Sequence, residues 1–577
     1  MAAILGIDLG TTYSEVAVLR DGQPEVVPVD GEPIMPSCVG LDSQGALIVG
    51  RAARNQMALA PENTILSIKR KMGKNEPVAL GERSFSPEEI SALILRKLKQ
   101  AAEAHLGEEV TQAVITVPAY FDDAQRKATQ NAGQLAGLEV LRIINEPTAA
   151  ALAYDAGLEE DQTILVYDLG GGTFDVSLVV VEKGVVEVKA SHGDTALGGD
   201  DFDNLLIAHA AEVFREAHQV DLLQEPRVRN RLWAAVEAAK RKLSDVPFAR
   251  IREEYLWQDH HLDLEIARHD YEELIRPLVR KSMDCVHHCL RDASLLPGAV
   301  DRVILVGGAS RTPLISELIR QEMRREPAFE INPELIVAMG AAIQAGILAG
   351  QQTRSVLVDI TPYTFGTQAL SFQHGEMRDD HFVPIIRRIT PLPVSKAEVF
   401  VTAVDEQRQV DVRIYQGEAP SVDDNIFIGD FLIEGLSKVP AGNEIILNLA
   451  LDLNGVLSVT ALEKRTGLSK TVRMETGGKG PEFDLQAARR NLAELSGDEP
   501  AADEPGASVP ADRQDLLTRA KDQRRRAMAL MANIDETDAG ELRLLLQQVQ
   551  DAIGSGDFTK LADVLTSLDD MLFYLED

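Results

Sequence analysis

The sequence predicts a multidomain protein: a duplicated α/β region, then an antiparallel β domain, then a helical tail. One motif, an apolar strand followed by Asp-Leu-Gly, occurs twice, at Ile4–Thr12 and at Ile164–Asp175. Apolar residues alternate with a period of two between Thr361 and Met474, and a helical pattern begins at Glu482. A chain of 577 residues is too long for one hydrophobic core, so several domains are expected.

The composition argues against several classes of protein. A net charge of −33 disfavours nucleic acid and anionic membranes as partners, because both need a basic surface. The sequence shows no basic leader and no long uncharged apolar run, so we expect neither a signal peptide nor a membrane span. Three cysteines do not form a disulfide framework, and a reducing cytoplasmic location is expected.

The two repeated motifs are candidate phosphate-binding hairpins. Consecutive glycines at 170–172 let the backbone approach a ligand and direct its N–H groups outward. Asp168 beside them could hold Mg²⁺ through water. One such hairpin could equally be an ordinary turn, but its repetition at Asp8–Thr12 favours a nucleotide held between two similar lobes.

In the first lobe, helices are expected at Ser86–Leu98 and Asp122–Ala136, with Ser86 as a cap, and a buried strand at Val114–Pro118. An alanine-rich helix at Ala149–Tyr154 follows the next strand. Glu146 lies where that strand ends, a common position for a functional carboxylate. It could equally be an acid that stabilises the helix dipole, and the sequence leaves both readings open.

The second lobe continues with a glycine turn at Leu197–Asp200 and an amphipathic helix at Arg231–Leu243. A strand then runs into Gly307-Gly308 and a helix at Pro313, which leaves free N–H groups at a helix start. A helix at Glu334–Leu348 carries small residues that allow close packing. Cys285 and Cys289 lie four apart on a further predicted helix, 271–293. They could bind Zn²⁺, but no second pair completes the site, and a buried helix face is favoured.

Residues 351–360 resemble a linker with an apolar run at Val356–Val358, either a docking segment or an edge strand. The β domain that follows contains a hairpin with a two-residue turn at Asn454-Gly455. An acidic, Pro- and Ala-rich stretch at 497–512 predicts a flexible segment. Three short amphipathic helices are expected after it, at 514–531, 539–553 and 557–575.

Five motifs resemble those of the DnaK-type seventy-kilodalton heat-shock chaperone family, over nearly the whole sequence up to about Met474. They are GIDLGTTYS at Gly6–Ser14, VPAYFDDAQRKAT at Val117–Thr129, IINEPTAAALAY at Ile143–Tyr154, DLGGGTFDVS at Asp168–Ser177 and VGGASRTPLI at Val306–Ile315. The KRKMG stretch at Lys69–Gly73 and the ITPYTFG segment at Ile360–Gly366 look most like the specialised HscC-type branch.

The resemblance implies an actin-like two-lobed ATPase domain (1–350), a linker (351–360), a peptide-binding β-sandwich (361–476) and a helical lid with its tail (477–577). It implies ATP or ADP and Mg²⁺ as cofactors, with K⁺ as a further candidate ion. Mg²⁺ and its waters would be held by Asp8, Glu146 and Asp168. The catalytic groups would be these three with Lys69 at the γ-phosphate, and Thr173 and Asp175 at the attacking water. The nucleotide would be bound by Gly10, Thr11, Thr12, Tyr13, Gly170, Gly171, Gly172, Thr173, Gly198, Gly199, Asp200, Glu237, Lys240, Arg241, Ser244, Gly307, Gly308, Ser310 and Arg311.

The resemblance also implies a slow ATPase coupled to the binding of extended apolar segments of unfolded proteins. Nucleotide state would be relayed by Pro118, Arg126 and Glu146, and through the linker residues Val356, Leu357, Val358 and Asp359. Arg142 and Asp359 match positions linked to the response to a J-domain co-chaperone. The peptide groove would be lined by Leu370, Phe400, Ala403, Val410 and Val412.

The chain departs from the family pattern in ways that affect its partners. The segment 73–85 is short, which puts a standard contact with a nucleotide exchange factor in doubt. Glu334 replaces the usual Asp, Thr367 replaces an apolar groove residue, and the helical tail is short. These changes favour a specialised regulatory chaperone with few clients as an alternative to a general one. A sugar kinase or a filament protein of the actin superfamily would share the two-lobed fold, and the β domain speaks against the kinase.

Overall fold

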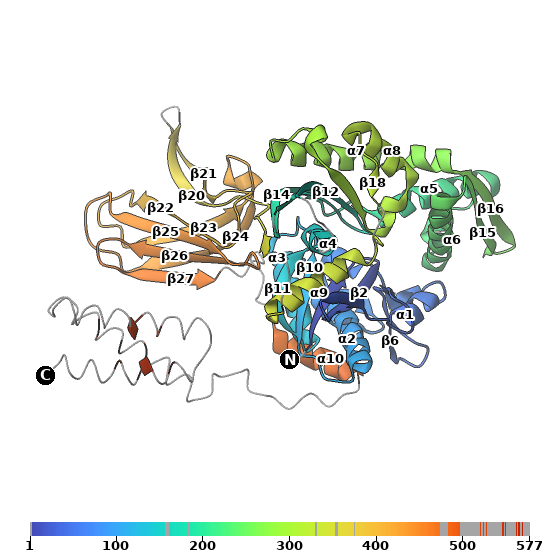
Figure 1. Ribbon diagram of the computed structural model, residues 1–577, viewed down its shortest axis with the longest axis horizontal. Coiled ribbons are helices and arrows are strands. Elements are labelled where there is room, and N and C mark those ends of the chain that lie inside the picture. The colour runs from blue at the N-terminus through green and yellow to red at the C-terminus, as the bar shows by residue number, and fades with distance from the viewer. Residues whose placement is uncertain are drawn as a thin grey trace. The chain divides into compact units, whose positions relative to one another are not determined.

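The computed structural model describes residues 3–155, 161–182, 184–328, 332–351, 356–373, 376–473 and 483–496, and ten further positions between 520 and 568. The chain divides into two compact units, residues 1–492 and 493–577. Figure 1 shows the first unit as two α/β lobes and a β domain. The second unit is described separately below.

The first lobe is built on a mixed sheet in the order β11-β10-β1-β2-β3, with β4 (Met35–Pro36) also paired to β2. Three strands form an antiparallel meander and two join it in parallel with β1. The bounds are β1 (Ile4–Leu9), β2 (Tyr13–Arg20), β3 (Gln23–Val26), β10 (Gln112–Val117) and β11 (Glu139–Asn145). The sheet packs against α2 (Pro87–Leu106) and α3 (Asp123–Leu135). Ser86 and Asp122 cap these helices with reciprocal capping boxes, so both predicted starts are confirmed, while α2 runs eight residues beyond Leu98.

A subdomain is inserted between β3 and α2 of this lobe. It holds two small sheets, the first short helix and two 3₁₀ turns. Their bounds are β5 (Val39–Leu41), β6 (Leu47–Val49), α1 (Arg51–Gln56), η1 (Pro61–Asn63), β7 (Thr64–Ile65), η2 (Ile68–Lys71), β8 (Val78–Leu80) and β9 (Arg83–Phe85). The η2 turn carries Lys69, which is buried.

The second lobe repeats the topology of the first. Its sheet has the order β18-β17-β12-β13-β14-β19, again with an antiparallel meander joined by parallel strands. The bounds are β12 (Gln162–Leu169), β13 (Phe174–Glu182), β14 (Val185–Asp194), β17 (Arg302–Val306) and β18 (Pro327–Ala328). The predicted internal duplication is therefore confirmed, because each glycine turn joins the first two strands of its sheet.

Helices and one hairpin cover the outer face of the second sheet and form an extensive hydrophobic core with it. They are α5 (Gly199–His218), η3 (Leu222–Gln224), α6 (Pro226–Asp245), β15 (Phe248–Trp257), β16 (His260–Ala267), α7 (Arg268–Asp292), η4 (Pro297–Ala299), η5 (Gly308–Arg311) and α8 (Pro313–Met323). Cys285 and Cys289 both lie on the buried face of α7, and the Cys289 thiol contacts the carbonyl of Ala190 at 3.4 Å. Their burial confirms the favoured prediction of a buried helix face.

Two helices, α4 (Glu146–Asp155) and α9 (Ile336–Leu348), pack against each other between the two sheets (Figure 1). The contact is closest at Gly340, where a Cβ atom would lie 1.7 Å from the carbonyl oxygen of Ala149. Small residues in α9 therefore set the distance at which the two lobes join.

We expect Gly340→Ala to destabilise the protein by about 1–3 kcal/mol or more, because the backbone of α4 must move to admit a methyl group. Thermal unfolding of the full chain measures this. Gly298→Ala is the matched control, because nothing lies within 4 Å of a Cβ atom placed there. An equal effect of both substitutions would contradict the packing argument.

The β domain contains two four-stranded antiparallel sheets, β21-β20-β23-β24 and β22-β25-β26-β27. Their inner faces share one core. The bounds are β20 (Phe365–Gln373), β21 (Glu376–Ile386), β22 (Val394–Val401), β23 (Gln409–Gln416), η6 (Val422–Asp424), β24 (Ile426–Glu434), β25 (Glu444–Leu451), β26 (Leu457–Glu463) and β27 (Ser469–Arg473). The alternation of Val410, Val412 and Ile414 correctly predicted one face of β23.

The predicted two-residue turn of the β25–β26 hairpin is wrong. The last pair of the ladder joins Leu451 to Leu457, so five residues form the loop. The carboxylate of Asp452 accepts the backbone N–H groups of Asn454 (2.8 Å) and Val456 (2.9 Å), and its carbonyl accepts the N–H of Gly455 at 3.0 Å, so the turn spans residues 452–455. The freed side chain of Asn454 accepts the N–H of Ile143 in the first lobe at 3.0 Å.

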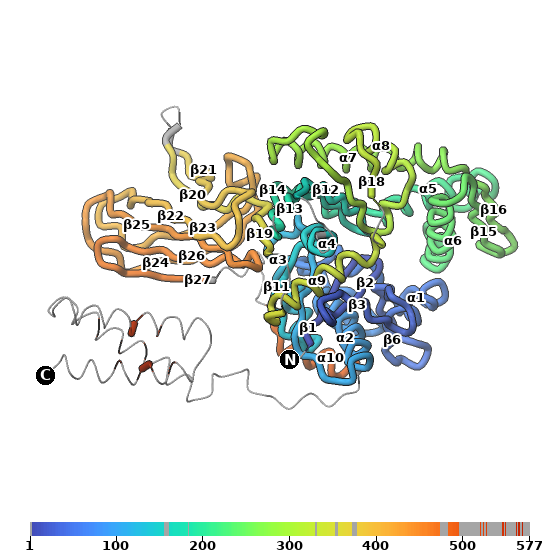
Figure 2. Tube along the Cα trace, viewed as in Figure 1, coloured from blue at the N-terminus to red at the C-terminus, as the bar shows by residue number. Residues whose placement is uncertain are grey.

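The interdomain segment forms β19 (Val356–Val358), which pairs in parallel with β14 at the edge of the second sheet (Figure 2). The sequence left two predictions open for residues 356–358, a docking segment or an edge strand. The structure combines them, since the linker docks onto the second lobe as the edge strand of its sheet. Beyond the β domain, α10 (Leu485–Ser496) carries Asn491, whose amide donates to Glu89 of α2 at 2.7 Å.

In the second unit, the described positions are all helical: residues 493–496 are the end of α10, and the ten positions beyond them fall within the three predicted helices. Most of them are buried and follow helical spacing, as at 561, 564, 565 and 568. The predicted flexible segment at 497–512 lies outside the described residues. Within the part of the chain that the structure describes, no helix is long and apolar enough to cross a membrane.

Candidate functional site

A cavity of about 590 Å³ lies between the two lobes, at the ends of both glycine turns. This volume is in the range of small-molecule sites. Nineteen of the residues predicted to bind the nucleotide or its metal line it. They are Asp8, Gly10, Thr11, Thr12, Tyr13, Glu146, Asp168, Gly170, Gly171, Thr173, Gly199, Asp200, Glu237, Lys240, Arg241, Ser244, Gly307, Gly308 and Arg311.

Five predicted residues lie next to the cavity but do not line it. Lys69 lies behind Glu146, and Asp175 accepts the N–H of Tyr120 at 3.1 Å. Gly198 packs on the backbone of Gly171, and Ser310 bonds the carbonyl of Gly307. The fifth, Gly172, packs against the side chain of Thr11.

Nine further lining residues were not predicted: Glu15, Asp203, Lys242, Asp245, Val306, Ala309, Pro333, Glu334 and Val337. Glu15 lies opposite Asp8 in the hairpin of β1 and β2, so both side chains point to the same face of the sheet. The sequence predicts this hairpin, and strand alternation would therefore have been enough to place Glu15 beside the cavity. Lys242, Asp245 and Pro333 come from loops and helix faces that only the tertiary structure brings together.

The two glycine turns fit against each other so closely that side chains are excluded. A Cβ atom at Gly171 would lie 1.8 Å from the hydroxyl of Thr12, and one at Gly10 would lie 2.0 Å from the carbonyl of Tyr13. The Thr12 hydroxyl is buried and has no hydrogen-bond partner among the described residues. Backbone N–H groups and a free hydroxyl at such a turn fit a phosphate chain.

Carboxylates surround one buried lysine at the base of the cavity. Lys69 forms an ion pair with Glu146, and Asp8 accepts the hydroxyl of Thr116 at 2.8 Å. Burial opposes the charged form of Lys69, but Glu146 and Asp8 outweigh it and raise the pKa of its ammonium group. Lys69 therefore stays charged at neutral pH.

Burial dominates the acids around Lys69. Desolvation, followed by the charge of Glu146, raises the pKa of Asp8 to about 7 and that of Asp175 to about 8. The same causes, with Asp175 added, raise the pKa of Asp168 well above its usual range. These carboxylates lack enough positive charge around them, and a cation in the cavity would let them ionise.

The donor set fits Mg²⁺ bound to phosphate. Asp8, Glu146 and Asp168 offer hard oxygen ligands beside the glycine turns. Among the described side chains, no three acids, histidines or cysteines converge tightly enough to ligate an ion directly. This spacing suits an ion that keeps most of its water shell, and the phosphates of a ligand would complete it.

Several side-chain bridges run from lobe to lobe beside the cavity, and the sequence did not reveal them. Arg54 of α1 pairs with Glu237 of α6 and stacks on Trp233, 4.8 Å from the ring centroid. Arg70 of η2 makes two hydrogen bonds to Asp201, and Ser67 donates to Asp200 at 2.7 Å. Both partners lie in the first turn of α5. These bridges hold the lobes closed around the cavity.

A buried polar network joins the first lobe to the linker. Arg126 donates to the Asn145 side chain at 2.7 Å, and Asn145 donates to Asp359 at 3.0 Å. Arg142 is buried beside Asp359, and each lies within the electrostatic reach of the other. Burial raises the pKa of Asp359, while the bond from the Ile360 N–H and then Arg126 and Arg142 oppose that rise. Pro118, the last predicted relay residue, is buried and its carbonyl accepts the N–H of Phe121.

The β domain contacts both lobes. Tyr363 donates its hydroxyl to the carbonyl of Tyr120 at 2.6 Å, and the two rings lie 4.9 Å apart. Arg388 forms two hydrogen bonds of 2.6 Å with Asp292 at the end of α7. Because Tyr120 also donates its N–H to Asp175, this residue connects the base of the cavity to the β domain.

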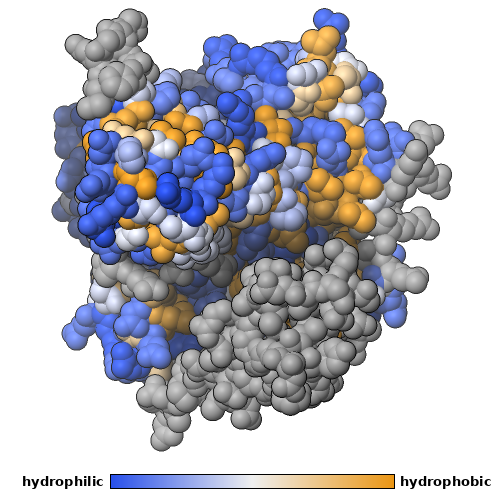
Figure 3. Space-filling view, turned by 90° about the vertical axis from the view of Figure 1, so that its left-hand side faces the viewer, coloured by the Kyte–Doolittle hydropathy of each residue, from blue (hydrophilic) through white to orange (hydrophobic). Residues whose placement is uncertain are grey.

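The five predicted groove residues do not share one environment. Val412 is buried in the core of the β domain, and Phe400 and Val410 are partly buried against the same core. Leu370, at 52% exposure, and Ala403 are exposed. Thr367 is buried and donates its hydroxyl to the carbonyl of Arg413 at 2.8 Å, so this polar substitution is satisfied within the domain. Apolar and polar side chains mingle on the face shown in Figure 3.

A family model described as Hsp70 protein matches residues 4–79 and 76–573 of the chain. Hsp70 proteins are ATP-dependent chaperones that bind ATP or ADP with Mg²⁺, and they bind unfolded polypeptides and co-chaperones. The duplicated lobes, the cavity between them and the β domain agree with this match. The chain therefore belongs to the Hsp70 family.

Proposed function

We propose that this chain is a DnaK-type chaperone of the HscC-like branch, which hydrolyses ATP slowly and uses the nucleotide state to switch its affinity for extended apolar peptides. One observation carries the proposal. The cavity with its two glycine turns is joined, through Asp175 and Tyr120, to the β domain. We further propose a cytoplasmic location and the domain boundaries 1–350, 351–360, 361–476 and 477–577.

The residues of the cavity have distinct tasks in this proposal. The glycine turns and Thr11, Thr12 and Thr173 bind the phosphates, while Glu237, Lys240, Arg241, Ser244, Gly308 and Arg311 surround the nucleoside. Asp8, Glu146 and Asp168 hold Mg²⁺, which supplies charge neutralisation for the phosphates; K⁺ is a second candidate ion. Lys69 stabilises the negative charge that develops during phosphoryl transfer, and Asp175 and Thr173 orient the attacking water.

Slow hydrolysis follows from this donor set. Phosphoryl transfer to water needs positioning and charge compensation, and the cavity offers few groups that activate the water. Slow hydrolysis at such a site sets how long the protein stays in its ATP-bound state. Because ATP and peptide each favour a different arrangement of the domains, each ligand weakens the binding of the other by linkage.

The peptide is proposed to bind the β domain as an added extended segment, near Leu370, Phe400, Ala403, Val410 and Val412. Backbone hydrogen bonds would supply affinity, and one apolar pocket would supply a loose preference. The buried, satisfied Thr367 favours a narrow set of clients over a general role. Arg142 and Asp359 are proposed to mediate the response to a J-domain partner, and the short segment 73–85 weakens the case for a standard exchange factor.

Single-turnover ATP hydrolysis, with and without an extended apolar peptide, tests the proposal. We expect slow turnover that the apolar peptide accelerates and that a charged peptide of equal length does not. A turnover rate that neither peptide changes would contradict the proposed coupling between peptide binding and hydrolysis, but it would still support the proposed ATPase activity. No turnover, with ATP still bound, would overturn the ATPase itself.

A further inference from the structure

Glu15 is a buried acid that the proposed mechanism does not use. It lies on β2 and lines the cavity, yet only 3% of its surface is exposed. In the antiparallel ladder it stands directly opposite Asp8. Opposite residues in such a pair point to the same face of the sheet, so both carboxylates face the cavity.

The carboxylate of Glu15 has no hydrogen bond or ion pair among the described residues. Its neighbours in the cavity are better satisfied. Glu146 pairs with Lys69, Asp203 accepts from Lys240 at 2.7 Å, and Glu334 lies 3.6 Å from Arg311. Lys69 already forms an ion pair with Glu146. Glu15 therefore lies beside Asp8 without a cationic side chain as its ion-pair partner.

Two physical costs act on this arrangement. Like charges directly opposite each other on a sheet destabilise it, and a buried carboxylate without a donor loses its hydration. Glu334 and Glu146 add further negative charge near Glu15. A proton or a cation must offset these costs. The position of Glu15 on the wall of an open cavity, rather than inside the core, makes a cation accessible to it.

We propose that Glu15, together with Asp8, holds a divalent cation in the cavity before a nucleotide enters. Two carboxylates and water are a common donor set for Mg²⁺ or Mn²⁺. The nucleotide would then meet a pocket that already carries its ion, and the ion would remain when the nucleotide leaves. The inference rests on the proposed nucleotide cavity, but it requires no ATP hydrolysis.

The test measures Mn²⁺ binding to the full chain, shown by its absorbance to carry no adenine nucleotide. Calorimetric titration and thermal unfolding with increasing Mn²⁺ report affinity and stabilisation separately, because a ligand that binds only the folded state raises the melting temperature. We expect one Mn²⁺ site in the wild type, and Glu15→Gln to weaken it at least about tenfold, in line with the loss of a carboxylate that holds the ion through its water shell.

Two variants accompany this measurement. Glu15→Asp keeps the charge on a shorter side chain, and we expect it to retain part of the affinity. Glu25→Gln removes an acid on β3 of the same sheet that does not line the cavity, and we expect it to change the affinity by less than about threefold. A folded Glu15→Gln variant is recognised by a melting temperature without Mn²⁺ equal to or above that of the wild type.

Equal Mn²⁺ affinity in the wild type and Glu15→Gln would overturn the inference. So would a wild type that binds no Mn²⁺ and is less stable than Glu15→Gln, because Glu15 would then be a protonated structural acid. Failure of ATP turnover with the Mn²⁺ site intact would instead count against the proposed function alone.

Discussion

Replacing Lys69 by alanine is expected to lower the single-turnover rate of ATP hydrolysis by about 10²–10³-fold, the usual loss when one preorganised charge donor is removed. Lys69 is buried and paired with Glu146 at the base of the cavity, where low dielectric strengthens its effect. Its pKa is raised, so it carries its charge throughout the neutral range. Rapid mixing of excess protein with ATP measures the rate.

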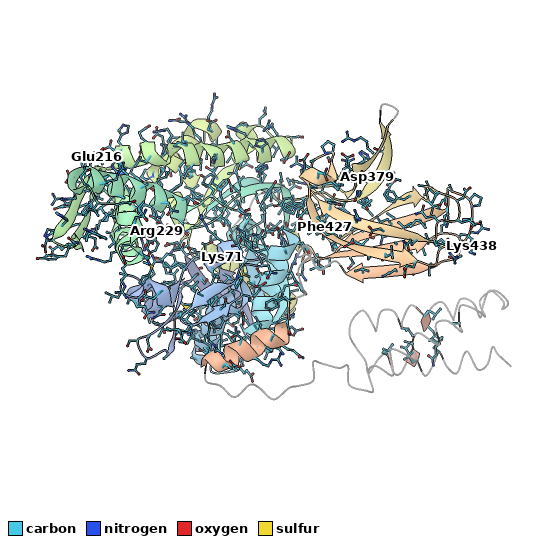
Figure 4. All side chains as sticks on the ribbon, turned by 180° about the vertical axis from the view of Figure 1, so that it is seen from behind. Lys71, Glu216, Arg229, Asp379, Phe427 and Lys438 are labelled. Carbon is cyan, nitrogen blue, oxygen red and sulfur yellow. The ribbon has the colours of Figure 1, made fainter. Side chains whose placement is uncertain are left out.

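The neighbouring Lys71 provides the control for this experiment. It lies on the same 3₁₀ turn but is exposed (Figure 4), and we expect Lys71→Ala to change the rate by less than about threefold. ATP binding and thermal unfolding must be measured on both variants, because Lys69→Ala leaves Glu146 buried without its partner. A folded Lys69→Ala variant that binds ATP and hydrolyses it at the wild-type rate would contradict the assignment of Lys69 as a catalytic group.

Substitution of Asp359 by asparagine is expected to abolish the acceleration of ATP hydrolysis by peptide, a loss of about tenfold. Asp359 accepts bonds from Asn145 and from its own neighbour Ile360, and it compensates the buried charges of Arg126 and Arg142. Neutralising it removes the counterion of Arg142 and the foremost of the acids that compensate Arg126, and it weakens the link between the first lobe and the linker. The ratio of rates with and without peptide measures the effect.

An exposed aspartate in the β domain serves as the matched substitution here. Asp411 lies on β23 and pairs with Arg413 at the surface, so Asp411→Asn is expected to leave the ratio unchanged. The peptide-free rate of Asp359→Asn should stay within about threefold of the wild type, because the residue does not line the cavity. If peptide accelerates this variant as it does the wild type, the network at Asp359 does not carry the coupling.

Much of the fold could be predicted because it depends on local patterns. The repeated Asp-Leu-Gly hairpins correctly indicated two lobes of the same topology, and Ser86 and Asp122 start their helices as capping residues should. The periods of the α/β region and of the β domain gave the correct classes for both. The loop at Asp452 was mispredicted, because the carboxylate and the carbonyl of Asp452 both accept loop N–H groups and place the turn at residues 452–455, one position before the predicted one.

The sequence alone determined the duplication and the glycine turns, since these follow from strand periods and from residues with special backbone behaviour. Most of the residues that line the cavity were predicted from the resemblance of the sequence motifs to a known family. Only the tertiary structure decided which charges meet. Lys69 reaches Glu146, Arg70 reaches Asp201 and Asn145 reaches Asp359 across separations of many residues. The same holds for Glu15, whose neighbours include acids from distant parts of the chain. Electrostatic partners depend on distance and burial in space, and neither quantity is encoded in local sequence.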